Sequence, residues 1–170
     1  MSPGGQPLAG FDKRLVAYVL DSLILGAISL VVLLPAYICA FFVIMQPLTT
    51  VNGEVIDGET GVRAFLSLMV VILVLIALGL GLSYVYHVEL ALRAGGQTHG
   101  KRIAKIRIVP LNPTEPLTRR HLALRFFSQV GMNYVPGLGL VDGLYQLWDK
   151  PYQQCLHDKA AKTVVVRLGP

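Results

Sequence analysis

Charged residues are scarce in this sequence. Of its 170 residues, 15% are charged and 54% are hydrophobic, whereas about a quarter of a soluble domain is charged. The two cysteines, Cys39 and Cys155, lie far apart, which indicates reduced thiols and excludes a disulfide framework. No zinc spacing is present, and no serine or cysteine nucleophile has an acid and a histidine in a motif. We therefore expect a membrane protein that is not an enzyme and uses no metal or other cofactor.

Long hydrophobic runs are what the sequence does contain. From Leu15 to Met45 the one charge is Asp21, and from Ala64 to Tyr86 there is none. At 1.5 Å per residue, each run can cross the roughly 30 Å hydrocarbon core as a helix. We predict membrane-spanning helices at about 15–45 and 64–92.

The distribution of cations indicates the topology. Seven arginines and lysines lie in segment 93–120, whereas the loop 46–63 carries three acids and one arginine. Cationic loops stay in the cytoplasm, so we predict a multi-pass protein of the bacterial inner membrane with a cytoplasmic N-terminus. A signal peptide is the alternative for the first run, because Lys13 and Arg14 precede it, but the run is too long. The net charge of +5 then suits topology and anionic lipid headgroups, and no nucleic acid.

A third apolar stretch, Leu122 to Trp148, is interrupted. It contains Arg125, Asp142 and a break at Pro136-Gly137. If this stretch spanned the membrane, the basic C-terminal tail would lie outside, against the charge rule. We predict a broken helical segment at about 119–149 that re-enters the membrane, with a third spanning helix as the alternative.

Two short alternating runs, 102–109 and 163–167, predict strands. An isolated strand leaves its backbone groups unpaired, so we expect the two to form a small cytoplasmic sheet. Prolines and glycines predict a disordered head over residues 1–13, followed by a single membrane domain over 14–170. The predicted fold class is an all-α membrane protein with a small β element.

Charges inside apolar segments need partners, because an unpaired charge in the membrane is costly. Arg14 and Asp21 are seven residues apart and therefore share a helix face. Folding the third stretch at its break brings Arg125 and Asp142 to a similar depth. We predict a network of these four residues. It either neutralises itself and clamps the third stretch to the first helix, or leaves Asp21 free to exchange a proton or cation.

The segment Gly95 to Arg102 partly matches a phosphate-binding loop. Gly95, Gly100 and Lys101 are in register, but Arg102 replaces the required Ser or Thr, and the loop follows a helix where a strand is needed. We therefore reject a nucleotide site. The glycines are expected to end the second helix, and the two cations to contact lipid phosphates.

Three motifs stand out along the chain: Arg14-Leu15-x-Ala17 leading to Asp21, Gly96-x-Thr98-x-Gly100-Lys101-Arg102 before a strand, and Leu156-His157-Asp158 before Thr163. Together they resemble the RDD family of bacterial membrane proteins, which is named for an arginine and two aspartates. The resemblance implies roles for Arg14 and Asp21, and for Asp158 as the last aspartate, with Asp142 as second choice. His99 departs from the family, which commonly has proline there.

Two functions of different classes fit these features. The first is a non-catalytic membrane subunit or partner-binding module of a larger assembly, with structural charges. The alternative is a cation/proton transporter that uses Asp21, since the resemblance implies a group suspected of transport. Two spans and a hairpin cannot enclose a pathway, so a transporter must be an oligomer. In both cases we expect a second copy or another membrane protein as partner.

Overall fold

The computed structural model describes residues 1–49 and 58–169. The chain clusters into two compact units. The first, here called the sheet unit, consists of Met1–Ile24 and Tyr84–Pro170, and the second, the apolar unit, is Leu25–Ser83.

Two predictions are not decided by the described residues. A single membrane domain over 14–170 stays a prediction, because two compact units can serve as one membrane domain. The predicted acidic loop 46–63 has its centre, residues 50–57, outside the described residues.

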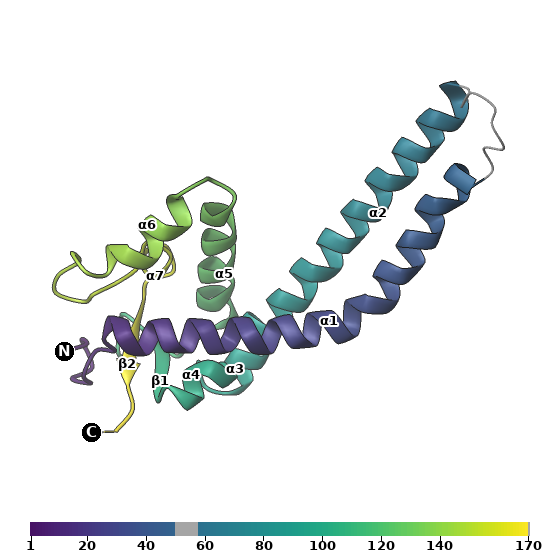
Figure 1. Ribbon diagram of the computed structural model, residues 1–170. Coiled ribbons are helices and arrows are strands. Elements are labelled where there is room, and N and C mark those ends of the chain that lie inside the picture. The colour runs from purple at the N-terminus through teal and green to yellow at the C-terminus, as the bar shows by residue number, and fades with distance from the viewer. Residues whose placement is uncertain (50–57, 170) are drawn as a thin grey trace. The chain divides into compact units, whose positions relative to one another are not determined.

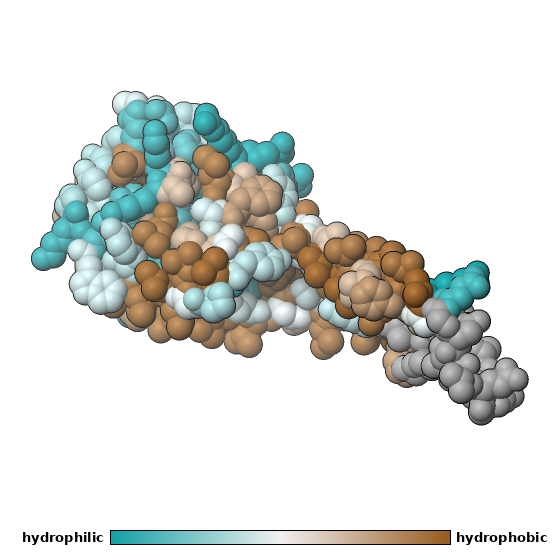
Figure 2. All heavy atoms as spheres, turned by 90° about the horizontal axis from the view of Figure 1, so that it is seen from above, coloured by the Kyte–Doolittle hydropathy of each residue, from teal (hydrophilic) through white to brown (hydrophobic). Residues whose placement is uncertain are grey.

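Two long helices contribute to the apolar unit (Figure 1). Helix α1 covers Phe11–Thr49 and helix α2 covers Gly58–Tyr84. The stretches Phe11–Phe42 and Gly61–Arg93 are long and apolar enough to cross a membrane, and 6% and 0% of their most apolar windows are buried. Figure 2 shows an almost continuous hydrophobic surface over this part of the chain. Both predicted long helices are confirmed as helices.

The helical path continues into the sheet unit and ends at two glycines. A π-helix, η1, covers Val85–Leu90, and α3 follows at Ala91–Arg93. Gly95 and Gly96 have φ angles of +65° and +90°, which L side chains rarely adopt. A Cβ at Gly96 would lie 2.4 Å from the carbonyl oxygen of Ile108. The predicted helix end at these glycines is confirmed.

The sheet pairs β1, Ile106–Pro110, with β2, Thr163–Arg167, in antiparallel register. The predicted pairing and the bounds of the second strand are confirmed. The first predicted strand, 102–109, is wrong over its first four residues, because α4 occupies His99–Ile103. Lysine and arginine in the last turn of α4 suit the negative end of a helix dipole, and Lys105 at φ +55° turns the chain into β1.

Residues 7–9 lie along the other edge of β2. Leu8 bridges Val166, the Ala9 N–H donates to Val165 at 3.0 Å, and the Arg167 N–H donates to Pro7 at 2.9 Å. Ala9 is fully buried. The predicted disordered head over residues 1–13 is therefore wrong here, since α1 already begins at Phe11 and the edge of a buried strand needs backbone partners.

The third apolar stretch forms two helices of the sheet unit, α5 at Arg119–Asn133 and α6 at Leu138–Tyr145 (Figure 1). Gly137, at φ +82°, lies in the turn between them, so the predicted break is confirmed. Large apolar side chains on this hairpin and just after it are exposed, among them Phe127, Leu140 and Trp148. Re-entry into the membrane stays a prediction.

A small core holds the sheet unit together. Its buried members come from residues 7–9, α1, η1, α3, both strands and α5: Ala9, Ala17, Val88, Ala91, Ile106, Ile108, Leu122, Phe126 and Val165. The short helix α7, Leu156–Ala160, precedes β2 and packs on α5. This arrangement brings residues from both ends of the chain to the charged groups described next.

Candidate functional site

Asp21 of α1 is buried and accepts three hydrogen bonds. The Tyr86 hydroxyl donates at 2.7 Å, the Thr98 hydroxyl at 2.5 Å, and the Gly100 N–H at 2.8 Å. Asp21 is 3% exposed, and no cation of the described residues forms an ion pair with it. Asp21 is therefore held by neutral donors alone.

The close approach of α4 to α1 depends on Gly100. A Cβ at this position would lie 2.5 Å from the Ala17 carbonyl oxygen and 2.8 Å from the Asp21 nitrogen. These neighbours are backbone atoms and cannot turn aside. The glycine is therefore required for the segment after α3 to present its hydroxyl and N–H groups to Asp21.

Asp158 of α7 is fully buried between two arginines. Arg14 of α1 contacts Oδ2 through Nη1 at 3.1 Å, and Nη1 of Arg125, on α5, contacts Oδ1. Oδ2 also accepts the Cys155 N–H at 3.2 Å, which caps α7. One carboxylate therefore joins α1, α5 and α7.

Asp142 of α6 holds His157 of α7. Its Oδ2 lies 2.5 Å from the imidazole Nδ1, and its Oδ1 accepts the His157 N–H at 2.9 Å. Burial, and then the positive charge of Arg125, lower the pKa of His157 to about 4, although Asp142 acts to raise it. The imidazole is therefore neutral at pH 7, and its Nδ1–H donates to the carboxylate.

The prediction that Arg14, Asp21, Arg125 and Asp142 neutralise one another is wrong, because none of the four forms an ion pair with another of the four. Both arginines meet at Asp158, while Asp21 and Asp142 have other partners. The physical reason is that a backbone N–H and two hydroxyls already satisfy Asp21, so it needs no cation. A functional role for the four residues stays a prediction.

The predicted motif around the glycines has several separate roles. Gly96 forms the turn before α4, and Thr98 and Gly100 donate to Asp21. Lys101 lines a small cavity, whereas Arg102 is exposed. Sequence reasoning missed Tyr86, which no motif marks, and gave no role to His157, although it stands beside Asp158 in the third motif.

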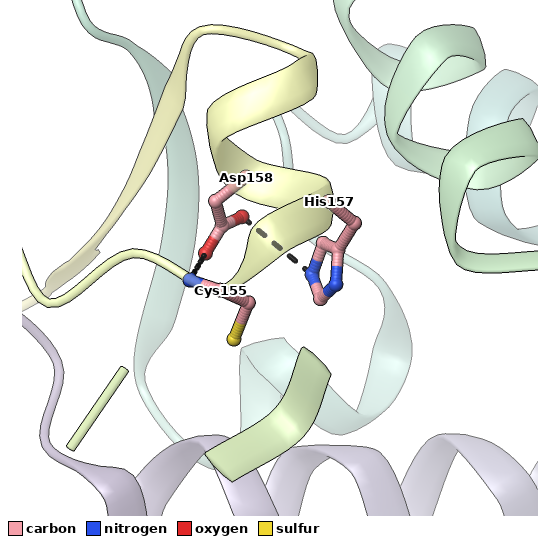
Figure 3. Close-up of side chains that lie close together, drawn as sticks. All are labelled: Cys155, His157 and Asp158. Carbon is pink, nitrogen blue, oxygen red and sulfur yellow. Dashed lines mark hydrogen bonds and ion pairs between the residues drawn. The ribbon is translucent and has the colours of Figure 1, made fainter. Parts of the chain in front are cut away.

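Cys155, His157 and Asp158 could together offer ligand atoms to a metal ion. Each residue offers one ligand atom, and these three atoms lie within 4.8 Å of one another. In Figure 3, one oxygen of the Asp158 carboxylate faces the His157 ring, and the other faces the Cys155 backbone nitrogen. Sequence reasoning had dismissed this spacing. However, Asp158 already binds two guanidinium groups, and burial raises the pKa of the Cys155 thiol. Asp158 is therefore a partner of the arginines, and His157 is a partner of Asp142.

Two helices that are long and apolar enough to cross a membrane point to an integral membrane protein. The model of the RDD family matches residues 8–162, so the chain belongs to the RDD family. No curated protein and no solved structure matches the chain.

Proposed function

We propose that this chain is a non-catalytic membrane module of a larger assembly, in which buried charges lock the sheet unit into one shape. The observation that carries this proposal is that each of the three carboxylates buried in the described part of the chain already has its partners. Asp158 has two arginines, Asp142 has a histidine, and Asp21 has three donors. None of them needs a ligand to be satisfied.

The charges of this region also balance. With His157 neutral, it holds three cations and three anions, namely Arg14, Lys101, Arg125, Asp21, Asp142 and Asp158. Such a balanced set of charges keeps a fixed arrangement, because removing one member of a buried ion pair leaves the other member without compensation. That favours a structural role over a cycle of charge exchange.

The apolar unit supports the assembly part of the proposal. Side chains of α1 and α2 in this unit are mostly uncovered by the chain itself, and Gly26, Gly79 and Gly81 have open space where a Cβ would lie. Small residues allow helices to pack closely in a membrane. We propose that a second copy or another membrane protein packs here, and that the sheet unit lies in the cytoplasm of a bacterial cell.

A cation/proton transporter is the second candidate, and one observation favours it. Asp21 is the only one of the three buried carboxylates that has no arginine or histidine partner among the described residues. Such a carboxylate can exchange a proton or cation if water reaches it.

Asp21→Asn separates the two candidates when stability and ion flux are measured on the same purified protein. For the module, proteoliposomes should carry no more pH-dependent cation flux than empty liposomes. The variant should lose about 1–3 kcal/mol of unfolding free energy, because hydrogen bonds to a charged acceptor are lost. Asp12→Asn, an exposed carboxylate of the same helix, is the control and should change stability less.

Flux that disappears in Asp21→Asn while stability is unchanged would establish the transporter and end the module proposal. The assembly itself is tested by native mass spectrometry of polymer-bounded discs cut from native membranes. The expected species is heavier than one 18.5 kDa chain, and a single chain in every disc would contradict the proposal.

A further inference from the structure

A small cavity in the sheet unit has polar walls that the proposed module role does not use. Its volume is about 20 Å³, enough for about one water-sized group, and it is partly open to the surface. The polar walls are His87 of η1, Lys101 of α4, and Arg125 and Gln129 of α5.

These polar side chains have spare hydrogen-bonding capacity. Within the described part of the chain, the side chains of His87, Lys101 and Gln129 make no hydrogen bond or ion pair. Arg125 uses Nη1 for both Asp158 and Thr163, so its other two nitrogens are free of described partners. Two of the four groups are cations, and none of the cavity-lining residues is an acid.

Contacts outside the cavity hold the backbone next to Lys101 and the guanidinium group of Arg125. Lys101 follows Gly100, whose N–H is bound to Asp21, and Arg125 is held by Asp158. Burial and the charge of Arg125 lower the pKa of Lys101 to about 8, while Asp21 raises it by a smaller effect. The potential at the lysine is therefore positive, and an anion in the cavity would relieve the repulsion.

We propose that this cavity is an oxyanion site that takes one oxygen of a phosphate group between Lys101 and Arg125. The cavity admits one oxygen-sized atom, so the rest of the phosphate lies at its mouth. A phosphate spreads its charge over several oxygens and can accept from a lysine, an arginine and an amide at once. The phosphate can belong to a lipid headgroup or be free in solution, because both present the same oxygens. The site does not depend on the module proposal.

The test uses the full chain in a phosphate-free maltoside detergent, with the thermal unfolding midpoint as readout. One arm titrates sodium phosphate against sodium chloride at equal ionic strength. The other arm titrates dioctanoyl phosphatidylglycerol against dioctanoyl phosphatidylcholine. Lys101→Gln should weaken the apparent affinity at least tenfold, whereas Arg102→Gln, which removes the same charge from the adjacent exposed position, should change it less than twofold.

A shift with phosphate identifies a free phosphate site, and a shift with phosphatidylglycerol alone identifies a lipid headgroup site. No shift in either arm, or an equal loss in Lys101→Gln and Arg102→Gln, overturns the proposal. Lys101 has no described ion-pair partner, so Lys101→Gln should fold as well as the wild type. If it does not, Gln129→Leu tests the opposite wall, and the proposal falls if that variant binds like the wild type.

Discussion

Asp21 and Asp158 are equally inaccessible to solvent but are stabilised in different ways. Asp21, 3% exposed, accepts from two hydroxyls and a backbone N–H, whereas Asp158, 0% exposed, lies between two guanidinium groups. Hydroxyls can rotate and accept a hydrogen bond when the carboxylate is replaced. Guanidinium groups have no acceptor and keep their positive charge, so they cannot adapt to a neutral replacement. The charge of its partners therefore predicts the contribution of a buried carboxylate to stability better than the degree of its burial does.

Asp158→Asn should have the largest effect of any change at these sites. It leaves Arg14 and Arg125 buried without a counter-charge, which typically costs about 3–5 kcal/mol of unfolding free energy. Thermal and denaturant unfolding in detergent measure the loss. Adding Arg14→Gln to this variant should recover part of it, because one of the two uncompensated charges is then removed.

Glu89→Gln is the matched control for this prediction. Glu89 also pairs with an arginine, Arg119, at 2.8 Å, but their side chains are 23% and 64% exposed. Exposed pairs contribute about 0–1 kcal/mol, so this variant should remain close to the wild type. Equal losses in Asp158→Asn and Glu89→Gln would show that burial between two arginines does not distinguish Asp158.

Gly100→Ala tests the Asp21 region without changing a charge. The new Cβ would meet backbone atoms of α1, and overpacking of this kind costs about 1–3 kcal/mol. Gly131→Ala, a helical position of α5 with open space around it, is the control and should stabilise the protein by up to about 1 kcal/mol. Hydrogen exchange at the Gly100 amide gives a local readout, since exchange should accelerate when α4 moves away from Asp21. A Gly100→Ala protein as stable as wild type would refute the close approach.

The pH dependence of stability should reveal the neutral His157 and is the smallest expected effect. Its folded pKa, about 4, lies below its ordinary value of 6.5, so the unfolded chain binds more protons between these values. This contribution is fully present above about pH 6.5 and is lost as the pH falls toward 4. Between pH 6.5 and 5, we expect a loss of up to about 2 kcal/mol. His157→Gln should flatten the slope over this interval, and an unchanged slope would contradict the assignment.

The sequence predicts the elements of this protein better than the contacts of its charges. Hydrophobic length alone locates α1 and α2, alternation locates β2, and Pro136-Gly137 locates the break between α5 and α6. Each of these signals is local. Arg14 and Asp21 are seven residues apart and therefore lie on one helix face, which is why the sequence suggested that they share a network.

The hydrogen-bond donors to Asp21 could not be predicted from the spacing of residues along the sequence. Thr98 and Gly100 are 77 and 79 positions away, and one of the donors is a backbone N–H, which every residue except proline possesses. The motif itself contains a signal that could have identified these partners. A glycine at position 100 is required when the backbone of another segment approaches it closely, as α1 does here. The ion pair between Arg14 and Asp158 was easier to predict, because the family resemblance had already selected both residues.

The separation of 144 positions between Arg14 and Asp158 has a consequence for biosynthesis. Translation at roughly 5–20 residues per second puts roughly 7 to 30 seconds between the two residues. Both long helices therefore leave the ribosome before α7 and β2 exist, and residues 7–9 wait as long for the strand they flank. A nascent chain that stops before α7 carries two arginines with no counter-charge and lacks the central strand of its sheet. The sheet unit can therefore complete its fold only after α7 and β2 have been synthesised.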